Sequence, residues 1–120
     1  MIENLNYKQV FVFGSNLAGH HAGGAALQAK EKFGAVEGVG EGVTGRCYAF
    51  PTLDEDMKRR DVRDLVESVR NLYDCCRDNS DKEFLLTKVG CGIAGYKESF
   101  MKSLFKNPPK NLIVPNQWKH

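Results

Sequence analysis

The chain has 120 residues, of which 42% are hydrophobic and 27% are charged, which is typical of one globular domain spanning 1–120. No apolar run approaches the roughly 20 residues needed to cross a bilayer, so we expect no contact with a membrane. The 17 basic and 15 acidic residues are intermixed and leave a net charge of +2, so we expect no nucleic-acid partner either. The N-terminal residues show no export signal, which favours a cytoplasmic location.

The four cysteines predict neither a disulfide framework nor a metal centre. Cys75 and Cys76 are adjacent, while Cys47 and Cys91 fall in segments with the character of a strand and of a glycine loop. We therefore expect reduced thiols. Because no cysteine or histidine pair has zinc-ligand spacing, we expect no bound metal and no cofactor.

Strand-like and helix-like segments alternate along the chain. Short apolar runs rich in β-branched and aromatic residues indicate strands, and apolar residues spaced three and four apart indicate helices. Five glycines in the segment 34–45 predict a flexible loop. The expected order is strand 9–13, helix 22–33, loop 34–45, strand 46–51, helix 57–77, strand 83–89, helix 98–105 and strand 111–114.

This alternation predicts an α/β fold, namely a three-layer α/β/α sandwich with a mixed, largely parallel sheet. Ligands of such sheets bind beyond the carboxyl ends of the strands. The first expected strand stops at Gly14 and the third runs into Gly90. The densest basic run, 57–61, is expected to be the solvated start of a helix. The two glycine junctions are therefore the candidate site.

Glycine-rich junctions suit phosphate groups, because glycine allows close approach of the backbone and clusters its N–H groups. The first junction runs over 14–26 and the second over 90–96. Neither has the spacing of a P-loop or of a dinucleotide fingerprint. The alternative is that both are ordinary tight turns. The candidate ligand-binding residues are Gly14, Ser15, Asn16, Gly19, Gly23, Gly24, Gly90, Cys91, Gly92, Ile93, Ala94, Gly95 and Tyr96.

Asn16, His20 and His21 are the candidate catalytic residues. Either histidine would serve as a general base near neutral pH, or both are solvent-exposed without a role, and the sequence does not distinguish the two. Asn16 either binds a sugar or stabilises its own turn. Cys91 either forms a reactive thiolate or, as we favour, packs as a small buried residue. Tyr96 flanks the ligand or belongs to the core.

Four motifs follow one another over residues 9–105: Gly14-Ser15-Asn16, the glycine cluster 19–26, Tyr48-Ala49-Phe50-Pro51, and Cys91-Gly92-Ile93-Ala94-Gly95-Tyr96. Their order resembles that of a small, divergent macro domain, the ADP-ribose-binding fold, of the phage and bacterial macro-like type. The resemblance implies that Asn16 faces the distal ribose with Tyr96 nearby. It also implies that the segment 92–95 binds the phosphates through its backbone.

Two family features are missing. Ala22-Gly23-Gly24 supplies no acidic residue beside the glycine cluster, and the early Gly-Asp-Ile motif whose Asp reads adenine is absent. The expected function is binding of ADP-ribose or a related nucleotide metabolite, and hydrolysis of ADP-ribosyl linkages is left open. If hydrolysis occurs, Asn16 and a histidine would orient water for attack at the anomeric carbon. The alternative is a non-catalytic protein that senses or sequesters a nucleotide.

Overall fold

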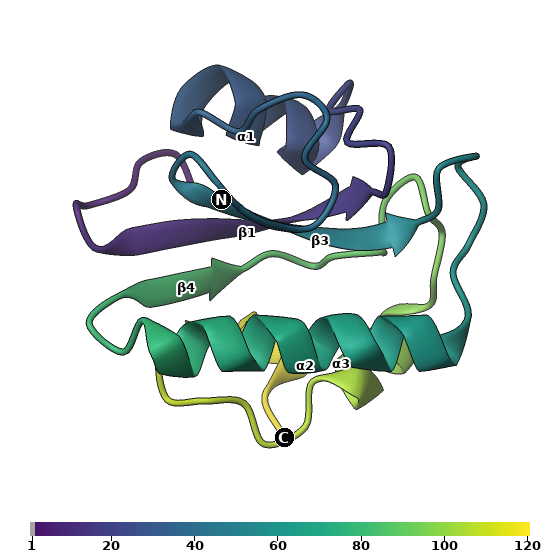
Figure 1. Cartoon of the computed structure of the whole chain (residues 1–120). Helices are drawn as coiled ribbons and strands as arrows, with labels where there is room; N and C mark the ends of the chain where they lie inside the picture. Colours follow the sequence, from purple (N-terminus) through teal and green to yellow (C-terminus); the bar gives the residue numbers. More distant parts are fainter. Residues whose placement is uncertain (1) are drawn as a thin grey trace.

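The computed structural model describes residues 2–120 and shows an α/β fold in which a mixed five-stranded sheet is combined with three α-helices (Figure 1). No helix among these residues is long and apolar enough to cross a membrane. The elements in chain order are β1 (Gln9–Asn16), α1 (Gly24–Phe33), β2 (Gly42–Thr44), β3 (Cys47–Leu53), α2 (Val62–Asp78), β4 (Glu83–Leu86), α3 (Glu98–Leu104), β5 (Leu112–Ile113) and the 3₁₀ turn η1 (Asn116–Trp118).

The sheet has the strand order β2-β3-β1-β4-β5, with β1 at its centre. Strands β3 and β4 both pair with β1 in parallel, and β5 is parallel to β4. Only β2, at one edge of the described sheet, runs antiparallel to its neighbour β3. The carboxyl ends of β1, β3 and β4 therefore meet at one edge, where ligands bind in parallel sheets.

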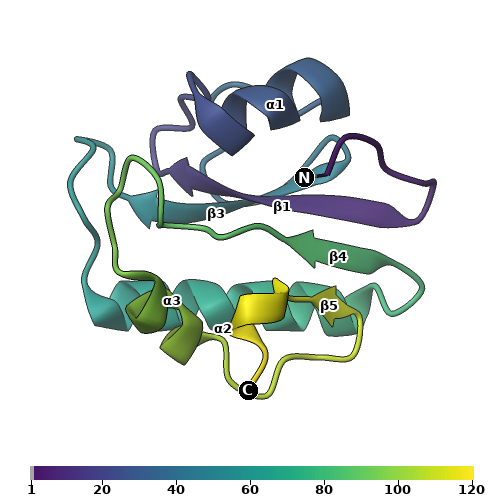
Figure 2. The ribbon, with the colours of Figure 1, turned by 180° about the vertical axis from the view of Figure 1, so that it is seen from behind.

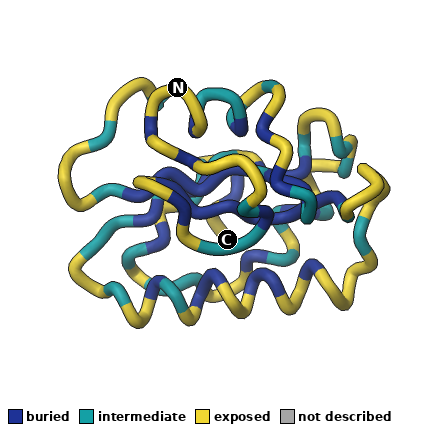
Figure 3. Tube along the Cα trace, turned by 45° about the horizontal axis from the view of Figure 1, so that its top comes forward, coloured by how far each residue is buried: buried dark blue, intermediate teal, exposed yellow. Residues whose placement is uncertain are grey.

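Helices cover both faces of this sheet. Figures 1 and 2 show α1 on one face and α2 with α3 on the other. Along β1, Phe11 and Phe13 pack into the smaller hydrophobic cluster beneath α1, whereas Val10 and Val12 pack into the larger cluster beneath α2 and α3. This alternation explains why the sequence of β1 is apolar throughout. Figure 3 shows the buried strands running through the centre of the molecule, surrounded by exposed loops.

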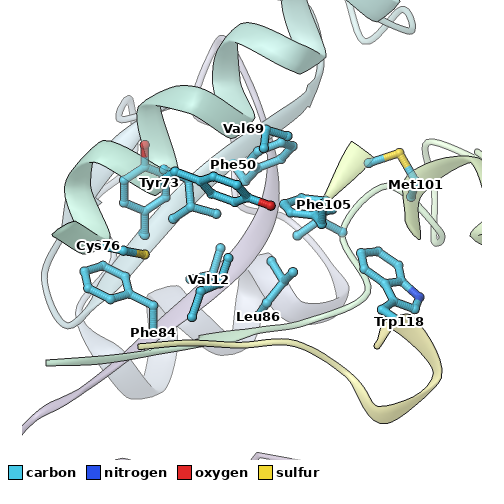
Figure 4. Close-up of a cluster of buried hydrophobic side chains, with 14 of the residues drawn as sticks. Val12, Phe50, Val69, Tyr73, Cys76, Phe84, Leu86, Met101, Phe105 and Trp118 are labelled. Atoms are coloured by element: carbon cyan, nitrogen blue, oxygen red, sulfur yellow. The ribbon is translucent and has the colours of Figure 1, made fainter. Parts of the chain in front are cut away.

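The larger hydrophobic cluster includes side chains from the C-terminal end of the chain (Figure 4). Trp118 is fully buried, and the centroid of its ring lies 5.6 Å from that of Phe105. Its indole N–H donates a 3.0 Å hydrogen bond to Glu98 Oε1, at the start of α3. Helix α2 contributes most of the apolar stripe that the sequence predicts, namely Leu65, Val69, Leu72, Tyr73 and Cys76. Val62 and Val66, which the same spacing places in the stripe, are exposed.

Several expected boundaries are wrong. Strand β1 does not stop at Gly14 but continues to Asn16, and the strand expected over 83–89 ends at Leu86. The segment 34–45 is not all loop, because Gly42–Thr44 pairs with β3 as the short strand β2. The helix expected from residue 57 begins only at Val62. The reason is the Asp54 carboxylate, which accepts hydrogen bonds from the N–H groups of Asp56 at 2.8 Å and Lys58 at 2.9 Å and so holds a turn there.

Candidate functional site

A cleft of about 320 Å³ lies at the sheet edge where β1, β3 and β4 end. Both glycine junctions contribute to its walls, together with the end of β3. The candidate residues Gly14, Ser15, Asn16, His20, Gly23, Gly24, Gly90, Gly92, Ile93 and Ala94 line it. The candidates Gly19, His21, Cys91, Gly95 and Tyr96 are not among its lining residues.

Asn16 holds the first glycine loop closed. Its Oδ1 accepts a 3.0 Å hydrogen bond from the His20 N–H, and its Nδ2 donates a 2.9 Å bond to the His20 carbonyl. The Asn16 carbonyl also accepts the Gly19 N–H at 2.9 Å. The register between β1 and β3 shifts at this point, because Ser15 pairs with Pro51 and Asn16 with Leu53, which leaves Thr52 of β3 as the extra residue. Asn16 thus lines the cleft while both ends of its amide fix the backbone of His20.

The glycine-rich segment that follows α1 packs against this loop. A Cβ atom on Gly40 would lie 2.5 Å from the Asn16 carbonyl oxygen and 2.6 Å from that of Leu17, so only glycine fits there without displacing the loop. The Ser15 hydroxyl donates to the Gly40 carbonyl. Ser15 therefore lines the cleft with its hydroxyl hydrogen committed to the support rather than to a ligand.

The N-terminus of α1 opens directly onto the cleft. Residues 23–26 all line it, and the first intrahelical bond runs from the Leu27 N–H to the Gly23 carbonyl. No side chain caps the helix at Gly23, and its first turn holds no acidic residue. The N–H groups of this turn have no intrahelical acceptors, and the helix dipole makes them the positive end of α1. The arrangement suits a bound anion.

The second glycine loop forms the opposite wall. The Tyr96 N–H donates to the Gly90 carbonyl at 2.9 Å, and the Gly95 N–H donates to the Gly92 carbonyl at 3.0 Å. These two bonds turn the loop back on itself, and Ile93 at its tip is 84% exposed. The loop is separate from a helix N-terminus, because α3 begins only at Glu98.

Arg59 fixes the second loop from outside the cleft. Its Nε donates to the Ala94 carbonyl at 2.8 Å and its Nη2 to the Gly95 carbonyl at 2.6 Å, while its guanidinium lies 5.1 Å from the centroid of the Tyr96 ring. The Tyr96 hydroxyl accepts the Arg60 N–H at 2.9 Å and lies 3.0 Å from the Thr52 carbonyl. The basic run 57–61 therefore links the end of β3 to the glycine loop through hydrogen bonds, and Tyr96 is one of the bonded residues.

The charge of the cleft favours an anion. Lys88 and His20 line it, and none of its described lining residues is acidic. Lys88 also forms a 3.0 Å ion pair with Glu98, and this pairing, with the Trp118 hydrogen bond, lowers the pKa of Glu98. The Lys88 ammonium and the helix N-terminus thus act in the same direction.

The two adjacent histidines have different environments. His20 is exposed and lines the cleft, and its Nδ1 lies 3.5 Å from Glu37 Oε2. His21 is buried, with its ring edge-on to Phe13 at 5.1 Å and its Nε2 3.2 Å from the Val36 carbonyl. His21 Nδ1 has no hydrogen-bond partner among the described residues. Only His20 is placed to meet a ligand in this cleft.

Cys91 is half-buried and lies outside the cleft lining. Burial raises the pKa of its thiol, the nearby Glu98 carboxylate raises it further, and Lys88 only partly opposes them. This environment opposes a thiolate and favours the packing role. All four cysteines carry free thiols.

Sequence reasoning missed several residues of this site. Those that line the cleft are Thr52, Leu53, Met57, Thr87, Lys88 and Val89, and those that support its loops are Arg59 and Glu37. Lys88 could have been found, because it comes two residues before Gly90 at the end of a predicted strand. Arg59 and Glu37 act through contacts with segments far along the chain, and no local pattern marks them. Met57 lines the cleft with a positive φ of 62°, which a non-glycine residue rarely adopts.

Comparisons with protein-family models, with curated proteins and with solved structures gave no match for this chain. The fold and the geometry of the cleft are therefore the observations on which a function must rest.

Proposed function

We propose that the cleft binds a phosphate-bearing nucleotide metabolite of the ADP-ribose class. The observation that carries the proposal is the meeting of two glycine loops and the uncapped N-terminus of α1 in one cleft without acidic lining residues. Backbone N–H groups from opposite walls would bind the two phosphates, as they do in other helix-terminus sites.

The remaining lining residues support the same ligand class. Lys88 supplies a positive charge beside the phosphate position, and the exposed apolar side chains of Met57 and Ile93 offer surfaces for a sugar or a base. The volume of about 320 Å³ lies at the low end of the roughly 300–1,000 Å³ usual for ligand sites. A ligand of this class would thus place its charged centre inside the cleft.

The proposal extends to the finer description of the fold, a macro-like three-layer α/β/α sandwich. It is supported by the distribution of α1, α2 and α3 over the two sheet faces and by the order of the motifs along the chain. The tight hold of Asn16 on His20 differs from the direct sugar contact that the resemblance implies. Asn16 is then a residue that shapes the loop around the ligand.

A thermal-shift titration with ADP-ribose, AMP, NAD and a cyclic dinucleotide tests the proposal. At about 100 times its dissociation constant, the bound ligand should stabilise the protein by about 2.7 kcal/mol. Gly92→Asp is the informative variant, because a Cβ on Gly92 meets no other atom within 4 Å and the added carboxylate repels phosphate. Gly92→Asn is its uncharged control.

We expect ADP-ribose to stabilise the native protein and Gly92→Asn far more than Gly92→Asp. No stabilisation by any of the nucleotides would contradict the proposal. Tight binding of ADP-ribose without turnover of an ADP-ribosylated peptide would assign the protein to the alternative class, that of nucleotide sensing or sequestration.

A further inference from the structure

The cleft has few groups able to move a proton. Among its described lining residues only His20 and Lys88 have a basic side chain, and Lys88 is engaged by Glu98. An ammonium is a poor proton acceptor at neutral pH, whereas imidazole is a good one. If the cleft supports acid–base chemistry with its own side chains, His20 is the residue that performs it.

His20 is unusually restrained for an exposed loop residue. Its N–H and its carbonyl are both held by the side chain of Asn16, at 3.0 and 2.9 Å. The two bonds fix the backbone from which the imidazole projects at the edge of the cleft. A side chain on a fixed backbone has fewer orientations to lose when it is aligned with a substrate.

Glu37 reaches His20 from a different segment, and it is restrained as well. Its Oε1 accepts the His21 N–H at 2.9 Å and lies 3.3 Å from Lys30 Nζ, while its Oε2 faces His20 Nδ1 at 3.5 Å. The His21 N–H, followed by Lys30 and His20, lowers the pKa of Glu37, so it is a carboxylate at neutral pH. The charged groups around the His20 ring are thus Glu37 and, behind it, Lys30.

The contact selects one tautomer of His20. A carboxylate only accepts hydrogen bonds, so it favours the proton on Nδ1 and leaves the lone pair on Nε2. No described protein group bonds to His20 Nε2. The 3.5 Å distance is long for a hydrogen bond, as is common for catalytic pairs before substrate binds.

We propose that His20 and Glu37 form an acid–base pair at the edge of the cleft, with His20 as the general base and Glu37 as the residue that positions it. The inference rests on the proposed ligand class and adds a reaction to it, hydrolysis at the anomeric carbon of a bound ADP-ribosyl group.

In the reaction one proton moves from water to His20 and then from His20 to the leaving group. His20 Nε2 takes a proton from water as the water oxygen forms a bond to the anomeric carbon. The bond from that carbon to the leaving group breaks, and its electron pair goes to the leaving atom. The imidazolium, stabilised by the Glu37 carboxylate, then returns the proton to the leaving group. Water is the only co-reactant, and no electron is transferred.

The orientation is tested without substrate by nitrogen-15 NMR of the histidine side chains. The neutral His20 ring should carry its proton on Nδ1. In Glu37→Gln, the amide oxygen can still accept the His21 N–H, but the amide NH₂ presents a donor to His20 and should move the proton to Nε2. His21, which pairs through Nε2 with Val36, provides an internal reference. An Nε2–H tautomer of His20 in the native protein would overturn the inference.

The chemical role is tested with a peptide ADP-ribosylated on a carboxylate side chain. His20→Gln should lower kcat by at least about 100-fold, the usual contribution of a general base. Glu37→Gln should lower kcat by at least about 10-fold, because it orients the wrong tautomer. Lys32→Gln, which changes an exposed lysine of α1 that forms no ion pair with Glu37, should leave kcat unchanged. The dissociation constant for ADP-ribose should change little in all three variants.

The outcomes separate the two proposals. If ADP-ribose binds but the native protein does not turn the peptide over, or if kcat survives in His20→Gln, the acid–base pair is refuted while the proposed ligand class stands. If ADP-ribose does not bind at all, the proposed function fails. The NMR experiment then still decides whether Glu37 orients His20.

Discussion

Replacing Gly23 by Asp should change stability and ligand affinity in opposite directions. Gly23 is the N-cap of α1, with φ −161° and ψ 167°, an extended conformation that any residue adopts. A Cβ atom placed there meets no atom within 4 Å. The site lacks both a capping side chain and an acidic residue in the first turn, so an aspartate would supply both.

The two effects have comparable sizes. An Asp in place of Gly at an N-cap gains a few tenths of a kcal/mol from capping, and its charge adds about 0.3–1 kcal/mol through the helix dipole. The sum, about 0.5–1.4 kcal/mol, corresponds to a rise in Tm of about 2–7 °C for a domain of this size. The same carboxylate about 4 Å from a bound phosphate would cost about 1 kcal/mol in water and about 4 kcal/mol at an effective dielectric constant of 20.

Because the cleft is open to solvent, we expect the smaller cost and an affinity for ADP-ribose reduced about 5-fold. Thermal unfolding without ligand and calorimetric titration with ADP-ribose measure the two effects. Gly23→Asn is the matched control, since it caps the helix without the charge and should bind more tightly than Gly23→Asp. A lower Tm for Gly23→Asp would refute the capping geometry. Unchanged affinity would show that no anion binds at this helix end.

Three further predictions concern the surroundings of the cleft. Arg59→Met removes two hydrogen bonds to the second glycine loop, so its amide hydrogens should exchange faster and ADP-ribose affinity should fall about 5-fold, whereas Lys58→Met should change neither. Because Lys88 lowers the pKa of Glu98, the ionised Glu98 stabilises the fold at pH values above 4.5, and this stabilisation is lost as the pH falls through the lower pKa of the folded state. Glu98→Gln should therefore flatten the dependence of Tm on pH below pH 4.5. Cys91, whose pKa is raised by burial, should react with iodoacetamide at pH 7 more slowly than a cysteine in an unfolded peptide, as followed by mass spectrometry, and rapid labelling would restore the thiolate hypothesis.

The parts of the fold that depend on local pattern could be predicted from the sequence. Strand β1 is buried on both faces, so its sequence is a continuous apolar run. Helix α2 is buried on one face, so its apolar residues recur at helical spacing. Each pattern predicts its element. Strand β2 has no such pattern. The residues Gly42 to Thr44 form a strand by pairing with β3. Val43 is 60% exposed, so no buried apolar pattern marks this strand in the sequence. Its pairing is a tertiary contact that the glycine content of the segment conceals.

The position of the cleft could also be inferred, because strands that run into glycine loops place those loops at one sheet edge when they are parallel neighbours. β1 and β4 are such neighbours. What supports the loops could not be inferred. Arg59 is 35 residues from Ala94, whose carbonyl it binds, and its sequence context is that of a solvated helix start. The backbone turn at Asp54 frees Arg59 from that helix and lets its guanidinium reach the loop.

The histidine pair shows most clearly where the sequence reaches its limit. His20 and His21 are equivalent as residue types, and both follow the same glycine loop. Neighbouring side chains in a non-helical segment point in different directions, so one ring meets the cleft and the other meets Phe13 and the Val36 carbonyl. Glu37, next to Val36, binds the backbone of His21 and faces the ring of His20. The segment after α1, expected to be a loop, therefore both buries one histidine and orients the other.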